Sequence, residues 1–439
     1  MNKEILYTSI FQNERVIFKS LVNEFTSKLY DEFDLTAQRI DLNSKINDLF
    51  IGKKVNYTED LAAWHPKYRD QYDPKIFDSP SQKEQQVELN NLFDLCKSAK
   101  NIVTIGIGGS FEGPKMLLEN MDTPYKEKNF IFITGSDLSE FRMKTNQLKK
   151  EDTIFVISSK SFSTEETILL LDQAISWSRD INKFVAITAN KTKAKEYGIN
   201  CVIEFDQQIG GRYSIWSEIS ILISWLNKEN FDDFMAGGKQ ADADLKNNEA
   251  YLKFVKTLAF TDIWLHNFKN KNSRAVLSYI WNWRSLPIYI QQLEMESLGK
   301  QPSTNSEHKK TGQIIFGGYG PTAQHSYFQL LHQGTQDICV DIIATKKDIK
   351  SLAYAQAMTQ SKLLSEGAIG LKDEERINGN SPINLFLINN ADLYDLGYLI
   401  ATWEHRTFIT AAMLGINPFD QFGVSAGKIF THKYQADIE

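Results

Sequence analysis

The sequence predicts an α/β fold made of doubly wound parallel sheets with helices on their faces. Short apolar runs typical of buried strands alternate with amphipathic stretches along most of the chain, as in successive β-α-β units. These runs fall into two sets, and a helical region over residues 214–270 separates them. Because a chain of 439 residues exceeds the size at which a single core stops growing, we expect two similar units, over residues 1–220 and 221–439.

Each predicted strand is a short run of apolar and β-branched residues, which suits a sheet buried on both faces. The first set spans residues 102–105, 130–134, 153–157, 184–188 and 202–205. The second set spans residues 275–280, 313–316, 338–343 and 384–387. Mostly helical segments are expected over the opening 90 residues and from Leu393 to Met413 near the end.

Hydroxyl side chains follow one predicted strand directly. The strand at 153–157 runs into Ser158–Thr167, which contains four further hydroxyl groups between its ends and one lysine, Lys160, before a helical pattern opens at Ile168. A helix N-terminus offers unpaired N–H groups and a partial positive charge, so this segment predicts an anion site that fits a phosphate. An ordinary helix cap is the alternative, because Ser and Thr are preferred N-cap residues.

A glycine-rich loop, Gly106–Ser110, follows the predicted strand at 102–105. A dinucleotide fingerprint would place a third glycine at Phe111, and a Walker A loop would place a lysine at Pro114, so neither NAD nor ATP is favoured. Glycines carry no Cβ, so the loop backbone can approach a small ligand closely. Loops at the carboxyl ends of parallel strands can face one crevice, where this loop and the hydroxyl segment would meet.

Later segments hold side chains suited to proton transfer. Arg212 follows a glycine pair just past a predicted strand, where it can stabilise a developing oxyanion or simply form a surface ion pair. Gln291–Lys300 holds two glutamates, and Gln324–Thr335 holds two histidines; each also fits a solvated helix face or a structural role. Phe419–Lys428 ends in a lysine that follows a glycine.

Composition narrows the class of protein. The net charge is −6 with acidic and basic residues interspersed, so nucleic acid is not expected as a partner. No run of about 18 apolar residues predicts a membrane span, and Met1–Ile5 lacks the apolar core of a signal peptide, so we expect a cytoplasmic protein. The three cysteines form no C-x-x-C pair, and the histidines lack metal-binding spacing, so we expect no metal and no cofactor.

Taken in order, these segments resemble the glucose-6-phosphate isomerase (phosphoglucose isomerase) family in its compact bacterial form, over roughly residues 50–430. The resemblance is carried by Asn56–Asp60, Gly106–Ser110, Ser159–Thr167, Asp206–Trp216, Gln291–Lys300, Gln324–Thr335 and Phe419–Lys428. It implies two sugar-isomerase domains with helical segments at both ends. It also implies reversible isomerisation of glucose 6-phosphate and fructose 6-phosphate through a cis-enediol(ate), in glycolysis and gluconeogenesis.

The resemblance implies roles for individual residues. Glu296 matches the base that moves a proton between the two reacting carbons, His325 the residue that helps open the sugar ring, and Lys428 a lysine near the ring. Arg212 matches the arginine that steadies the enediolate, and Glu166 a glutamate that partners the histidine. Substrate contacts are implied for Gly109, Ser110, Ser159, Lys160, Ser161, Thr164, Gln292 and Gln421. A homodimer is implied, in which the histidine crosses the interface between subunits.

The departures from the family pattern leave the matched catalytic residues in place. The loop before the histidine commonly reads G-E-P-G-T-N-G-Q-H, whereas residues 317–325 read G-G-Y-G-P-T-A-Q-H. Ser161 and Ser163 stand where threonines are usual, and Ser425-Ala426 where Glu-Leu is frequent. Two alternatives stay open: a non-catalytic sugar-phosphate-binding protein, which would leave the three matched proton-transfer side chains without a task, and an isomerase that also accepts mannose 6-phosphate.

Overall fold

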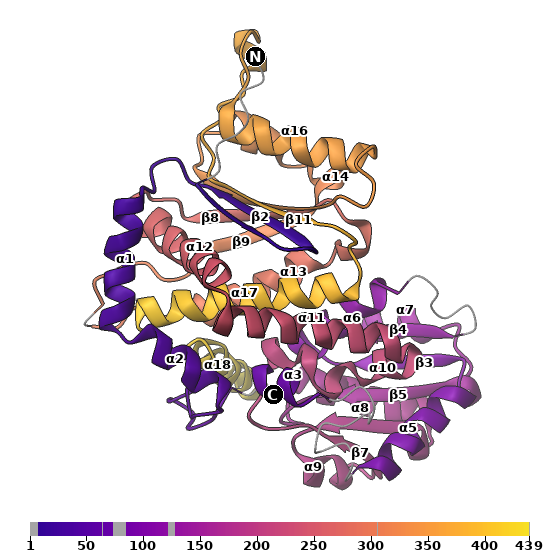
Figure 1. The fold of residues 1–439 in the computed structure, drawn as a ribbon. Helices are drawn as coiled ribbons and strands as arrows, with labels where there is room; N and C mark the ends of the chain where they lie inside the picture. Colours follow the sequence, from indigo (N-terminus) through magenta and orange to yellow (C-terminus); the bar gives the residue numbers. More distant parts are fainter. Residues whose placement is uncertain (1–7, 64, 73–84, 122–127, 305, 439) are drawn as a thin grey trace.

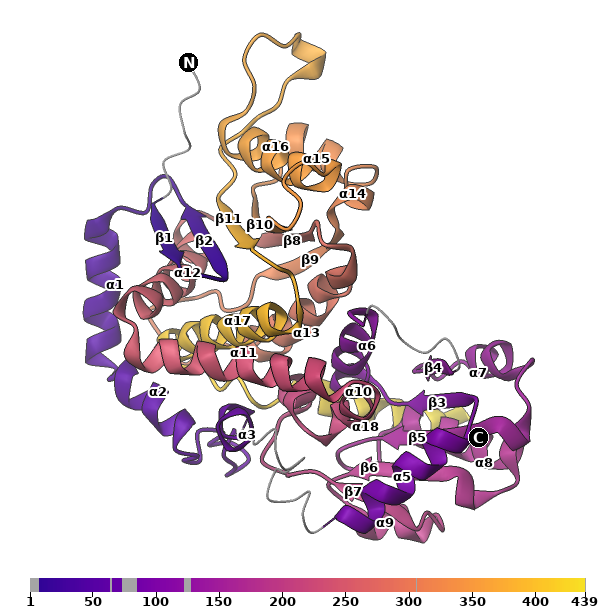
Figure 2. The same ribbon diagram turned by 45° about the vertical axis from the view of Figure 1, so that its right-hand side comes forward.

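The computed structural model describes residues 8–63, 65–72, 85–121, 128–304 and 306–438 (Figure 1). Residues 1–5, on which the prediction about a signal peptide rests, lie outside the described residues. The strands form two sheets, and the long helices α11 (Lys228–Asn247) and α17 (Leu393–Leu414) lie between them (Figures 1 and 2). No described helix combines the length and the apolar character that crossing a bilayer requires.

The first sheet has five parallel strands in the order β4-β3-β5-β6-β7. They are β3 (Asn101–Ile105), β4 (Asn129–Ile133), β5 (Thr153–Ser158), β6 (Phe184–Thr188) and β7 (Cys201–Glu204). All five predicted strands are confirmed, because their apolar residues are buried between two layers of helices. One layer contains α7 (Leu138–Thr145), α8 (Glu165–Ser178) and α9 (Lys191–Glu196), and the other contains α5 (Gln86–Ser98) and α10 (Ile221–Leu226).

The second sheet has six strands in the order β1-β2-β11-β10-β8-β9. Its parallel part consists of β8 (Ser273–Ser278), β9 (Ile314–Tyr319), β10 (Ile338–Thr345) and β11 (Ile383–Ile388), so the four predicted strands are confirmed with somewhat different ends. Helices α14 (Gly320–Ala323), α15 (Phe328–Gln333) and α16 (Leu352–Glu366) cover one face (Figure 2). Helices α12 (Glu249–Phe268), α13 (Leu286–Leu298) and α17 cover the other.

The start of the described chain differs from the predicted helical segment. Helices α1 (Ser27–Arg39), α2 (Leu42–Phe50) and α3 (His65–Gln71) agree with it, but two unpredicted strands precede them, β1 (Ser9–Gln12) and β2 (Val16–Leu21). Strand β2 pairs antiparallel with β11, so the second sheet is mixed. Its first strands therefore come from the beginning of the chain, while the predicted division into residues 1–220 and 221–439 stays a prediction.

The helical middle of the chain and the helix predicted over 393–413 are confirmed by α11, α12 and α17, and a further helix, α18 (Phe422–Ile438), follows beyond the predicted range. Helices α11 and α17 approach closely because small residues face each other. A Cβ atom added at Gly237 would collide with the carbonyl oxygen of Tyr394, and one at Gly397 would collide with that of Phe234. This close packing forms a rigid layer that separates the two sheets and supports the elements of the site.

Candidate active site

A cavity of about 640 Å³ opens at the carboxyl end of the first sheet. It lies beside β3 and β5, the neighbouring strands between which the strand order reverses. In open α/β sheets this switch point leaves a crevice where ligands bind. Every predicted site residue except His325 lines the cavity, namely Gly109, Ser110, Ser159, Lys160, Ser161, Thr164, Glu166, Arg212, Gln292, Glu296, Gln421 and Lys428.

The glycine-rich loop after β3 forms one wall because its glycines permit close contacts. Gly108 has φ +58°, a left-handed conformation that glycine adopts without steric cost, and a Cβ there would lie 2.9 Å from the Gln292 amide nitrogen. A Cβ at Gly109 would collide with the carbonyl oxygen of Gly211. The loop therefore packs directly against the 3₁₀ turn Gly211–Trp216, which carries Arg212.

The hydroxyl segment after β5 presents its side chains to the cavity at the N-terminus of α8. Phe162 has φ +48° and its ring is buried against Tyr197, so this turn anchors the segment in the core. Ser159 and Thr164 lie with their hydroxyl oxygens 3.3 Å apart. Thr164 is the N-cap residue of α8, yet among the described residues its side chain accepts no capping hydrogen bond. Its hydroxyl is thus available to an anion.

Lys160 brings a positive charge to the same segment. Burial lowers the pKa of its ammonium group, and the Arg212 guanidinium lowers it further, while Glu59 and Asp206 act in the opposite direction. A cation that is partly withdrawn from water and faces hydroxyl groups favours the binding of an anionic group.

Arg212 is buried and uses all three of its guanidinium nitrogens. Nε donates to the Ser297 hydroxyl at 2.7 Å, and Nη2 donates to the carbonyl oxygens of Pro418 and Asp420, the latter at 3.0 Å. Nη1 donates to Gln421 Oε1 at 2.9 Å. The planar guanidinium is therefore fixed from three sides, and its Nη1 edge faces the cavity.

Helix α13 places a carboxylate beside that edge. Gln292 and Glu296 are four residues apart and so lie on one face of the helix, and the Gln292 amide donates to Glu296 Oε2 at 3.2 Å. The same oxygen lies 3.4 Å from Arg212 Nη1. The Glu296 side chain is 24% exposed, which leaves it accessible from the cavity. A carboxylate next to a fixed guanidinium can accept a proton from carbon while the arginine stabilises the resulting negative charge.

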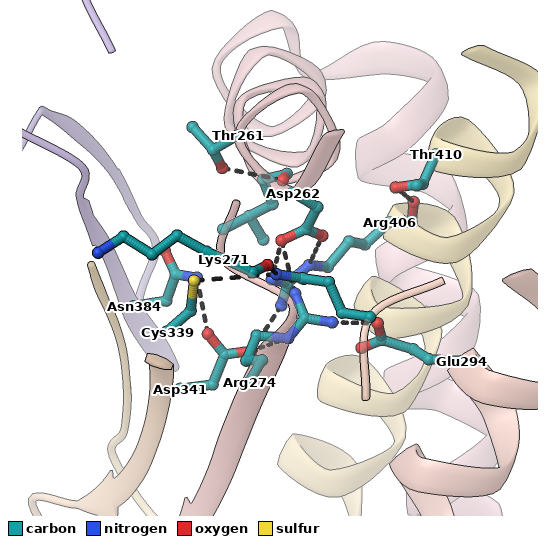
Figure 3. Close-up of polar contacts among 12 residues, drawn as sticks. Thr261, Asp262, Lys271, Arg274, Glu294, Cys339, Asp341, Asn384, Arg406 and Thr410 are labelled. Carbon is teal, nitrogen blue, oxygen red and sulfur yellow. Dashed lines mark hydrogen bonds and ion pairs between the residues drawn. The ribbon is translucent and has the colours of Figure 1, made fainter. Parts of the chain in front are cut away.

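The opposite face of α13 is anchored by a buried cluster of five charged residues, Asp262, Arg274, Glu294, Asp341 and Arg406 (Figure 3). Arg274 contacts Glu294, and the Trp403 indole N–H donates to the second oxygen of Glu294 at 2.6 Å. Burial raises the pKa of the Glu294 carboxyl, against the effect of Arg274. The two carboxylate oxygens of Glu294 thus accept from Arg274 in β8 and from Trp403 in α17. These contacts hold α13 against both elements and keep Glu296 on the cavity side.

Lys428 and Gln421 come from the C-terminal end of the chain. Gln421 precedes α18 and is held by Arg212, and Lys428 lies in the second turn of the helix, at the cavity. His432, one turn further, lies 2.9 Å from Glu165 at the start of α8. The described residues of α18 are otherwise exposed, so the helix lies across the mouth of the cavity rather than in the core.

His325 lies apart from this cavity. It follows α14 at the carboxyl end of β9, in the second sheet, and borders a separate hollow of about 390 Å³ together with His332 and Gln360. Within the described chain, His325 and Glu296 therefore share no cavity. In the main cavity, the buried Oε2 of Glu166 has no hydrogen-bond partner among the described residues.

Outside the hydroxyl segment, three polar side chains that line the cavity received no role from the sequence, those of Glu59, Asn190 and Gln207. Glu59 belongs to the segment Asn56–Asp60, which contributed to the family resemblance without an assigned role. Long-range hydrogen bonds bring this segment to the site, because Thr58 donates to Asp420 at 2.7 Å and Asn417 donates to Asn56 at 2.8 Å.

Known proteins resemble this chain in both sequence and fold. The family model for phosphoglucose isomerase matches residues 19–439. A glucose-6-phosphate isomerase from Shewanella sp. (strain MR-4) is 34% identical over 461 aligned residues, covering 92% of this chain and 84% of the relative. The solved structure of a glucose-6-phosphate isomerase from Chlamydia trachomatis has a TM-score of 0.84 at 23% identity and covers 98% of this chain and 90% of its own. The solved structure of a hypothetical protein from Thermus thermophilus has a TM-score of 0.72 at 19% identity and covers 93% of this chain and 99% of its own.

Proposed function

The chain belongs to the phosphoglucose isomerase family and interconverts glucose 6-phosphate and fructose 6-phosphate, and we propose that it does so in the cavity beside β3 and β5. The observation that carries this proposal is the meeting of an anion-binding segment and a carboxylate–guanidinium pair in one cavity. Glu296 and Arg212 lie 3.4 Å apart there, and the hydroxyl segment at the N-terminus of α8 forms another wall. We also place the enzyme in glycolysis and in the cytoplasm, on family membership alone.

The phosphate group of the substrate binds the hydroxyl segment. Ser159, Ser161 and Thr164 donate to its oxygens, and the helix N-terminus adds its partial positive charge. The remaining sugar and phosphate contacts come from Gly109, Ser110, Lys160, Gln292 and Gln421, which line the same cavity. A substrate bound through its phosphate group presents its other end, where the carbonyl group lies, to α13.

Glu296 transfers the proton. Its carboxylate removes the proton from carbon 2 of the open-chain aldose, and the electron pair forms the enediolate, whose negative oxygen Arg212 stabilises. The hydroxyl proton passes from oxygen 2 to oxygen 1, and the same carboxyl group returns its proton to carbon 1 to give the ketose. A positioned base contributes about 10²- to 10⁴-fold to such a step.

Ring opening precedes this step, because the cyclic sugar has no free carbonyl group. We assign it to His325 of a second copy of the chain, acting with Lys428. Two observations support the shared site: His325 lies outside the cavity of its own chain, and the buried Glu166 Oε2 can accept a hydrogen bond from an incoming histidine.

The test is an assay of the purified protein with fructose 6-phosphate, coupled to detection of glucose 6-phosphate, with EDTA present and no nucleotide added to the isomerase. We expect turnover under these conditions. Binding of fructose 6-phosphate without turnover would instead identify a sugar-phosphate-binding protein, and activity on mannose 6-phosphate in a parallel assay would identify the broader isomerase.

A further inference from the structure

Ser297 follows Glu296 directly in α13 but points in another direction, into the core. It is fully buried, and its hydroxyl oxygen contacts both Arg212 and Tyr213. We propose that Ser297 is a positioning residue, which orients the Arg212 guanidinium toward the substrate oxygen that becomes negatively charged. This inference rests on the proposed function, in which Arg212 and Glu296 act together.

The geometry of Arg212 shows what the Ser297 hydroxyl fixes. The guanidinium is planar, so holding Nε and Nη2 determines the direction of Nη1. Nη2 is held by the carbonyl oxygens of residues 418 and 420, and Nε is held by Ser297 at 2.7 Å. Nη1 is the remaining edge, and it reaches both Gln421 and Glu296. Without the contact at Nε, the angle of the plane would depend on the backbone carbonyls at Nη2 and on the Gln421 side chain, which lies at the cavity itself.

The hydroxyl group of Ser297 is itself fixed. The Tyr213 hydroxyl lies 2.9 Å from it, and the Tyr213 ring is buried and stacks on His65 with the ring centroids 4.5 Å apart. A serine hydroxyl can donate one hydrogen bond and accept two, so it can accept from Arg212 and still exchange a hydrogen bond with Tyr213. The chain Tyr213–Ser297–Arg212 thus leaves each of these polar atoms with a partner in a site closed to water.

A purely local role is the competing explanation, because buried serines in helices often donate to their own backbone. Ser365 does so in α16, where its hydroxyl donates to the Ser361 carbonyl at 2.8 Å. Ser297 instead connects two parts of the chain, since Arg212 lies in the 3₁₀ turn after the first sheet and Ser297 lies in α13. The helix that carries the base therefore also sets the direction of the arginine.

The experiment compares Ser297→Ala with Ser365→Ala, a matched loss of one buried hydroxyl group away from the cavity. Turnover is measured with fructose 6-phosphate, and calorimetry measures binding of two phosphorylated ligands. A five-carbon sugar-acid 5-phosphate carries a carboxylate in place of the enediolate charge, and a six-carbon alditol 6-phosphate carries no charge there. For Ser297→Ala we expect kcat to fall about 10- to 100-fold and the sugar-acid phosphate to bind weaker by a similar factor.

The alditol phosphate should bind within about threefold of wild type, because its recognition depends on the phosphate segment and not on the direction of Arg212. For Ser365→Ala, kcat and the affinities for both phosphorylated ligands should stay within about twofold of wild type. Equal weakening of both ligands, or unchanged kcat, would overturn the positioning role. Tyr213→Phe, which keeps the packed ring, should show the same selective loss at smaller size, so the proposal stays testable if Ser297→Ala does not fold.

Turnover of Glu296→Gln and Ser297→Ala together distinguishes an error in the role of Ser297 from an error in the proposed site. If Glu296→Gln retains wild-type turnover, both are wrong. If Glu296→Gln is inactive while Ser297→Ala behaves as wild type, the proposed site stands and only the role of Ser297 is rejected.

Discussion

Glu296 faces the cavity with one carboxylate oxygen between Arg212 and Gln292, at 3.4 and 3.2 Å. Glutamine at this position keeps the shape of the side chain but cannot accept a proton from carbon. We expect Glu296→Gln to lower kcat at least about 100-fold while the affinity for fructose 6-phosphate stays within a few-fold.

Steady-state kinetics together with calorimetric binding measure the two effects separately. Glu196→Gln, on the exposed surface of α9, is the matched control and should behave as wild type. A Glu296→Gln enzyme that keeps more than about a tenth of wild-type turnover would rule out Glu296 as the base.

At the residue scale, the sequence could predict most of the cavity lining because strand ends and motifs are local patterns. Gly109 and Ser159 follow the ends of β3 and β5 within four residues, and Arg212 follows the end of β7 by eight, so their placement depends on nearby chain. Glu59 could not be placed this way. It reaches the cavity through hydrogen bonds between residues 56–58 and 417–420, contacts that exist only in the folded chain.

The N-terminus of α8 offers a test between an anion site and an ordinary helix cap. Thr164→Val removes a hydroxyl group that makes no capping bond in the described structure, so stability should change by less than about 0.5 kcal/mol while KM for fructose 6-phosphate rises. Thr26→Val is the matched control, because Thr26 does cap α1 by accepting from the Leu29 N–H at 3.3 Å.

For Thr26→Val we expect the reverse pattern, a loss of about 1 kcal/mol in the free energy of unfolding with unchanged KM. Urea unfolding and steady-state kinetics on both variants provide the comparison. A Thr164→Val protein that loses stability and keeps its KM would show that this threonine acts as a cap.

Helix α17 carries a buried carboxyl group whose protonation links stability to pH. Glu404 accepts hydrogen bonds from Arg69 and from the Trp216 indole, at 2.5 and 2.8 Å. Burial nevertheless raises the pKa of Glu404 from 4.5 to about 7. The folded chain therefore binds this proton more tightly than the unfolded chain, and the contribution of Glu404 to stability falls as pH rises from 4.5 through about 7.

Glu404→Gln removes this titration. The free energy of unfolding of the wild type, minus that of the variant, should decrease between pH 5 and pH 7 by up to about 1.4 kcal/mol per pH unit. Urea unfolding at pH 5, 6 and 7 measures the difference, with Glu196→Gln as the exposed control. Parallel pH profiles for Glu404→Gln and the wild type would contradict the raised pKa.

At the element scale, the parallel strands of the first sheet could be predicted because each contains a run of apolar and β-branched residues, such as residues 154–157 in β5. Strands β1 and β2 give a weaker signal. They have four and six residues, and polar residues such as Gln12 and Lys19 interrupt their apolar pattern. Their pairing with β11 provides the buried surface that a hairpin of this length lacks on its own.

The whole molecule is predicted to act as a dimer with two shared sites. Glu296→Gln and His325→Ala chains should each be inactive alone. When they are dissociated and reassociated together, each mixed dimer has one site with both residues intact, so random mixing should restore about a quarter of wild-type activity. Native mass spectrometry verifies the mixed dimers, and their inactivity would show that each chain builds its own site.

At this scale the sequence could not place His325 from local patterns. Its apolar surroundings predict only a histidine on a helix face, whereas the structure has it just after α14, beyond the end of β9. In the proposed dimer, the cavity that receives it is decided by contacts between chains, and no spacing within one chain encodes these. Glu296 and His325 are 29 residues apart in the sequence, and this separation carries no such information.

The pairing of β2 with β11 has a consequence for how the protein is made. Residues 16–21 leave the ribosome long before their partner, residues 383–388, which is translated after about 360 further residues. At roughly 5 to 20 residues per second, the edge of β2 stays open for about 20 to 70 seconds on a nascent chain. The second sheet is thus completed only after residues 383–388 have emerged, and β2, one of the earliest described strands, waits longest for its second neighbour.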